Sequence, residues 1–152
     1  MSNRLVPALD RYNIFNFKDC EKFVLLSDEW YKEKFTEVRQ FIENEGITVR
    51  DIKYEPFEVM PNSYDSYCNA SYCIGGDAIE IGYYDNENTK LISLLHEYGH
   101  TKLNEYGRPI DIFNAEKLCW KIGLELAEKF DIPIIDDDYK FIVKFLILSS
   151  FI

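Results

Sequence analysis

Apolar residues recur at helical spacing in the first third of the chain, between Asp28 and Asn44. Lys and Glu fill the positions between them, so one side of a helix is predicted to be buried and the other solvated. Ser27 or Asp28 can cap this helix, and Gly46 can end it. A shorter helix is expected before it, over residues 20–26. The predicted buried side of the longer helix consists of Trp30, Phe35, Val38 and Ile42.

Two β-rich stretches follow. Residues 47–60 are rich in β-branched and aromatic side chains and predict one or two strands, with Pro56 at an edge or a break. Residues 78–84 alternate apolar side chains with Glu80 and Gly82, which is typical of a half-exposed strand. At a sheet edge such a strand could pair with the backbone of an extended peptide, or it could be an ordinary edge.

The second half of the chain returns to helical patterns. One helix is predicted from about Thr89 to residue 104, and another over residues 111–130, which Pro133 closes. Aspartates at 136–138 place negative charge at the start of a final apolar helix. Helices, a short β region and further helices predict an α+β fold, with a small mixed or antiparallel sheet packed against the helices.

The helix that begins near Thr89 carries the motif His96-Glu97-Tyr98-Gly99-His100, which has the pattern H-E-x-x-H. The two histidines lie one turn apart on one face and can converge on a single metal ion. Glu97 stands beside the first ligand, where it can act as general base on a water molecule. Gly99 leaves room for a neighbouring element to pack closely. The alternative is a solvated or structural histidine pair, but these are the only two histidines in the chain.

A catalytic zinc site needs a third protein ligand, and we expect a carboxylate because no other histidine remains. Glu116 is the best candidate, since a carboxylate on a buried helical stripe is costly unless it is paired or bound to metal. The alternative is a first-turn Glu that interacts with the helix N-terminus. Asp111 and Glu105 are the reserve candidates. The other members of the stripe are apolar or small: Cys119, Trp120, Gly123 and Ala127.

Two histidines and one carboxylate leave the fourth zinc position open, which is the catalytic pattern rather than the structural one. Attack on an amide carbonyl would create an oxyanion that needs a hydrogen-bond donor. Tyr106 and Arg108, shortly after the motif, are candidate donors, as are Tyr83 and Tyr84 shortly before it. The expected cofactor is one Zn²⁺ per chain.

Three segments together resemble the zincin metallopeptidases: AIEIGYY, LLHEYGH and NAEKLCWKIGLELA. Within the gluzincin-like branch, the nearest resemblance is to the ImmA/IrrE-type family of bacteria, phages and mobile elements. The resemblance covers about residues 74–130 and implies His96, His100 and Glu116 as zinc ligands, with Glu97 as catalytic base. It also implies a narrow set of protein substrates. The chain departs from the gluzincin pattern at Trp120, which stands where E-x-x-x-D has its aspartate.

The charge balance limits the partners. Lys and Arg number 17 against 27 Asp and Glu, for a net charge of −10. This argues against broad binding to nucleic acid or to an anionic membrane, because both need a dense positive surface. The apolar stretch 141–152 is too short to span a membrane and predicts a buried helix or a subunit interface. A protein or peptide substrate is therefore the expected partner.

Cysteine usage and the N-terminal sequence point to a cytoplasmic protein. The first 16 residues contain no apolar run typical of a signal peptide, and four cysteines are a modest number for 152 residues. We expect reduced thiols, with Cys68 and Cys73 as two unrelated thiols or a disulfide rather than a second metal site.

Without repeats or linkers, residues 1–152 are expected to form one domain, with N-terminal helices and strands in 1–60 and a metal-site core in 74–130. The predicted function is a zinc-dependent peptidase. The alternative is a non-catalytic module that uses a zincin scaffold to bind a protein partner.

Overall fold

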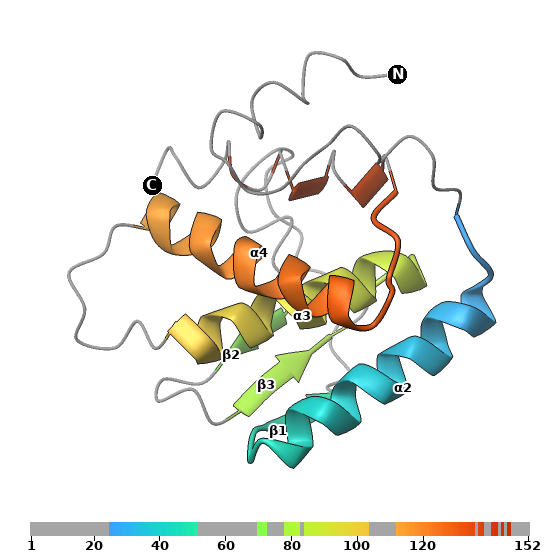
Figure 1. Ribbon diagram of the computed structural model, residues 1–152, viewed down its shortest axis with the longest axis horizontal. Coiled ribbons are helices and arrows are strands. Elements are labelled where there is room, and N and C mark those ends of the chain that lie inside the picture. The colour runs from blue at the N-terminus through green and yellow to red at the C-terminus, as the bar shows by residue number, and fades with distance from the viewer. Residues whose placement is uncertain are drawn as a thin grey trace.

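The computed structural model of the chain describes residues 25–51, 70–72, 78–82, 84–103, 112–135, 137–138, 141–142, 144 and 146 (Figure 1). One helix, three short strands and two further helices follow one another in these residues, so the fold is α+β, as predicted. The elements are α2 (Asp28–Asn44), β1 (Thr48–Asp51), β2 (Ala70–Tyr72), β3 (Ala78–Ile81), α3 (Glu87–Leu103) and α4 (Ile112–Lys129).

The sheet is mixed, with strand order β1-β3-β2. β3 runs parallel to β1, with Val49 opposite Ile79, and antiparallel to β2. The prediction that residues 78–84 lie at a sheet edge is therefore wrong, because β3 is the central strand. The burial of both its isoleucines agrees with the predicted alternation. Glu80, the residue that suggested exposure, is half-buried and meets Arg50 of β1 at 3.8 Å.

Helix α2 follows the predicted boundaries. The Ser27 hydroxyl accepts a hydrogen bond from the backbone N–H of Trp30 at 3.2 Å, and Gly46 ends the helix with a φ of 90°, which favours glycine. Its buried side is Tyr31, Phe35, Val38 and Ile42. Tyr31 takes the place predicted for Trp30 because it stands one full turn before Phe35, whereas Trp30 packs edge-on against the Tyr31 ring.

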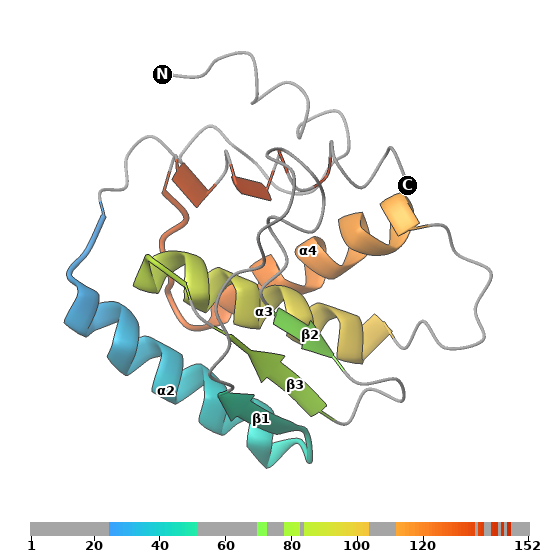
Figure 2. The ribbon, with the colours of Figure 1, turned by 180° about the vertical axis from the view of Figure 1, so that it is seen from behind.

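Helix α3 is the central element of the fold. It contacts α4 and α2 as well as strands β2 and β3, and both ribbon views place it between the sheet and α4 (Figures 1 and 2). It begins at Glu87, two residues before the predicted start near Thr89. Every residue from Leu91 to Thr101 is buried, so the face that carries His96 and His100 lies in the protein interior.

The residues after α4 return to the core. Residues 137–138, 141–142, 144 and 146 are helical, and we call them the C-terminal helical segment. Ile142 and Leu146 are buried in the main hydrophobic core, while Lys144 is exposed. Within the part of the chain that the structure describes, no helix combines the length and the hydropathy needed to cross a membrane.

Other predictions lie outside the described residues. They include most of the helix predicted over 20–26, of which only Leu25 and Leu26 are described, and these two are not helical. The predicted β-rich stretch 52–60 and the cysteines Cys68 and Cys73 are also outside.

Candidate metal centre

Two glycines let α3 and α4 pack at backbone contact distance. A Cβ on Gly99 of α3 would overlap the backbone carbonyl of Cys119, and one on Gly123 of α4 would lie 2.6 Å from the carbonyl oxygen of Leu95. Both distances are too short for a real side chain. The close approach predicted at Gly99 is therefore confirmed. It is reciprocal, because each helix contributes a glycine that contacts the backbone of the other helix.

This crossing brings His96 and His100 of α3 onto Glu116 of α4. His96 Nε2 lies 2.6 Å from Glu116 Oε2, and His100 Nε2 lies 3.3 Å from Glu116 Oε1. The two Nε2 atoms are 3.1 Å apart, and the imidazole rings meet edge to face. Among the described residues, these three side chains form a group that could hold a metal ion.

All three side chains are buried, at 2% exposed for His96, 6% for His100 and 5% for Glu116. Burial raises the pKa of the Glu116 carboxyl, but the adjacent histidines more than offset this through charge attraction and hydrogen bonds. The net effect holds the pKa of Glu116 well below its ordinary value, so the site presents a carboxylate at neutral pH. Glu116 lies beyond the first turn of α4, which is evidence against the helix-N-terminus alternative.

The three side chains lie close enough together to share one metal ion. Bonds of about 2.0–2.1 Å place tetrahedral ligand atoms about 3.3 Å apart. The 3.1 Å between the two histidine nitrogens is close to this value. His100 Nε2 contacts Oε1 of Glu116 and His96 Nε2 contacts Oε2, so the carboxylate would have to turn to bring one oxygen to a metal ion held by both histidines. Two imidazole nitrogens and a carboxylate oxygen are ligand types that zinc accepts.

The other residues of the motif are placed by the same helix. Glu97 follows the first histidine directly and is buried. The hydroxyl of Tyr98 donates to Glu45 Oε1 at 2.9 Å, and Lys102 Nζ lies 2.8 Å from the same oxygen. Burial, followed by this hydrogen bond, raises the pKa of Tyr98. The motif helix is thus tied to the residue that follows α2.

One contact of the site was not anticipated from the sequence. The indole of Trp120 stacks on the imidazole of His96, with ring centroids 4.2 Å apart and planes inclined by 29°. Helical spacing indicates that Trp120 lies on the same face of its helix as Glu116, because it stands one turn after Glu116 on the predicted buried stripe. The sequence shows that stripe but not which side chain of α3 it meets.

Several predicted site residues lie outside the described part of the chain. These are the candidate oxyanion donors Tyr106, Arg108 and Tyr83, and the reserve ligands Glu105 and Asp111. Tyr84 is described, and its half-buried ring packs against the main core.

Comparisons with protein-family models, with curated proteins and with solved structures gave no match to this chain.

Proposed function

We propose that the protein is a zinc-dependent peptidase of the zincin type. The observation that carries the proposal is the convergence of His96, His100 and Glu116 from two helices onto one buried point. The two histidines come from an H-E-x-x-H helix, and the carboxylate comes from the next helix along the chain. A peptidase of this type binds one zinc ion per chain.

A bound zinc ion would polarise the scissile carbonyl and acidify a water molecule. His96 and His100 would hold it through Nε2 and Glu116 through a carboxylate oxygen. Glu97 would act as the general base, taking a proton from the attacking water and passing it to the leaving amine. Burial of the carboxylates removes competing water, which strengthens their electrostatic effect on the reacting groups.

The burial of the four side chains also supports a second candidate, a non-catalytic module whose metal is structural. His96, Glu97, His100 and Glu116 are all buried, whereas a catalytic centre must admit a substrate. The general-base position of Glu97 favours the peptidase, because a purely structural metal site has no use for that carboxylate.

Proteolysis of a complex peptide mixture distinguishes the two functions. Zinc-loaded wild type and Glu97→Gln would be incubated with peptides from a cell digest, and new N-termini would be identified by mass spectrometry. Glu87→Gln, on the same helix, is the matched control.

We expect new termini with wild type and with the control, and none above background with Glu97→Gln, although that variant still binds zinc. Cleavage that survives Glu97→Gln would contradict the mechanism. A zinc-loaded wild type that cleaves no peptide would favour the binding module.

A further inference from the structure

Trp120 lies against the candidate metal centre but supplies no ligand atom to it. Its indole is 1% exposed and covers one face of the His96 ring at a centroid distance of 4.2 Å. With planes only 29° apart, the contact is a stack rather than an edge approach. The position of the indole therefore restricts the plane in which the imidazole can lie.

The indole is itself held in place from two directions. Its own helix supplies Glu116 one turn earlier, so the ligand and the stacking ring are rigidly related. The ring of Phe141, from the C-terminal helical segment, meets the indole edge-on at 6.2 Å. Trp120 thus links the packing of that segment to His96.

We propose that Trp120 is a positioning residue for the metal centre, which fixes the plane of the His96 ring so that Nε2 stays directed at His100 and Glu116. A histidine ring can adopt a broad range of angles about its second side-chain torsion, and a flat ring stacked against it restricts that range. A histidine side chain that is already oriented loses less conformational freedom when the metal binds, so the metal is bound more tightly. The proposal rests on the proposed function only as far as metal binding.

Zinc affinity, measured by competition with a chromophoric chelator, tests this role. Trp120→Leu removes the flat face and keeps an apolar side chain, while Trp120→Phe restores an aromatic face. Neighbours that orient ligands typically change metal affinity about 10–100-fold. We expect Trp120→Leu to weaken zinc binding by at least about tenfold and to alter the visible spectrum of the Co²⁺ form, and Trp120→Phe to recover most of the loss.

Leu126→Ala is the control for packing, because Leu126 is a buried residue of the same helix and belongs to the main core. It should lower the melting temperature and leave the zinc affinity and the Co²⁺ spectrum unchanged. A folded Trp120→Leu variant with wild-type affinity and spectrum would overturn the proposal. If wild type bound no metal, this proposal and the proposed function would both fail.

Fluorescence gives a test that does not depend on the folding of Trp120→Leu. The chain has two tryptophans, so Trp30→Phe leaves Trp120 as the sole emitter, and Trp120→Phe leaves Trp30. Co²⁺ should quench the Trp120 emission along the same titration curve as the visible absorption, and affect Trp30 much less. Trp120 emission that stays constant while Co²⁺ binds would overturn the contact on which the proposal depends.

Discussion

Three carboxylates are buried among the described residues, and each has a different environment: Glu97, Glu116 and Asp138. Glu116 is compensated by two histidines. Asp138 accepts hydrogen bonds from the Asn88 side chain at 2.9 Å and from the Ile135 backbone N–H at 3.2 Å. The second bond resembles a capping box, in which a side chain reaches back to the start of its own helix. Asp138 thereby joins the C-terminal helical segment to the first turn of α3.

Asp138 should make the stability of the protein fall as pH rises through the acidic range. Burial raises the pKa of Asp138 to about 6, despite its two hydrogen bonds. Between pH 4 and 6 the folded state therefore keeps a proton that the unfolded state has lost, so stability decreases with increasing pH. A shift of about two units corresponds to about 3 kcal/mol, present as stabilisation at pH 4 and lost by pH 7.

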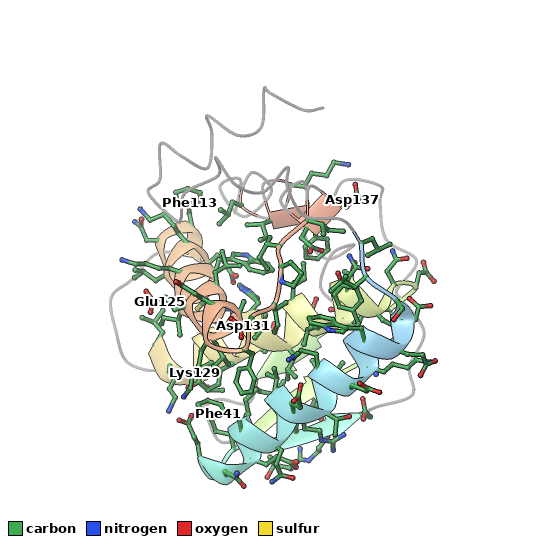
Figure 3. All side chains as sticks on the ribbon, turned by 45° about the vertical axis from the view of Figure 1, so that its right-hand side comes forward. Phe41, Phe113, Glu125, Lys129, Asp131 and Asp137 are labelled. Atoms are coloured by element: carbon green, nitrogen blue, oxygen red, sulfur yellow. The ribbon has the colours of Figure 1, made fainter. Side chains whose placement is uncertain are left out.

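Urea unfolding of wild type and Asp138→Asn across this range measures the effect. The stability of the variant relative to wild type should rise by about 3 kcal/mol from pH 4 to pH 7, because asparagine does not titrate. Glu125→Gln is the control, since Glu125 is an exposed carboxylate of α4 (Figure 3). A relative stability that is flat with pH for Asp138→Asn would contradict the assignment.

At the scale of elements, the crossing of α3 and α4 determines the geometry of the candidate metal centre. Gly99→Ala introduces a methyl group against the backbone of Cys119, which cannot rotate away as a side chain could. We expect destabilisation of about 1–3 kcal/mol or more, together with weaker zinc binding as Glu116 moves away from the histidines.

Thermal unfolding and zinc competition measure both effects, and Lys121→Ala, at an exposed position of α4, is the control. If the melting temperature and the zinc affinity of Gly99→Ala equalled those of wild type, the close helix contact would not be needed for the site.

The end of α4 offers a stabilising substitution. Asp131 adopts a φ of 54°, and the Ile132 N–H bonds to the Ala127 carbonyl at 2.9 Å, as in a Schellman motif. Glycine adopts this conformation without strain, so Asp131→Gly should raise the free energy of unfolding by about 0.5–1 kcal/mol. Urea denaturation would show this as a higher midpoint, whereas Asp131→Ala should show no such gain. A lower midpoint for the glycine variant would mean that the aspartate side chain contributes more than the strain costs.

A cluster between the ends of α2 and α4 completes the element packing. The rings of Phe41 and Phe130 meet edge to face, with their centroids 5.5 Å apart. Lys129 Nζ lies 4.1 Å from the centroid of the Phe41 ring. Figure 3 shows Phe41 and Lys129 beside each other, with Glu125 one turn before Lys129 on α4. These contacts and the Tyr98–Glu45 hydrogen bond hold α2 against the two helices of the site.

For the whole molecule, local patterns predicted the helices well and the sheet less well. The boundaries of α2 and α4 follow from caps, glycine and proline, which act within a few residues. The central position of β3 depends on pairing with β1, about 30 residues earlier in the chain, and no local pattern specifies such a partner. Glu80 misled the prediction because its partner, Arg50, comes from that distant strand.

The candidate site was accessible to sequence reasoning for chemical reasons. Two histidines at helical spacing and a carboxylate on an apolar stripe are each anomalous, and one metal ion would explain both. The stack of Trp120 on His96 was not predictable, because it depends on how α3 and α4 cross. Gly99 and Gly123 set that crossing, and their effect appears only when both helices are in place.

The metal content of the purified protein tests the central claim most directly. Elemental analysis would be applied to wild type, Glu116→Gln and the exposed control Glu125→Gln, all prepared without added metal. We predict about one zinc per chain in wild type and in the control, and little in Glu116→Gln, because two histidines alone bind zinc weakly. A wild-type protein without zinc, even after equilibration with micromolar zinc, would contradict the account.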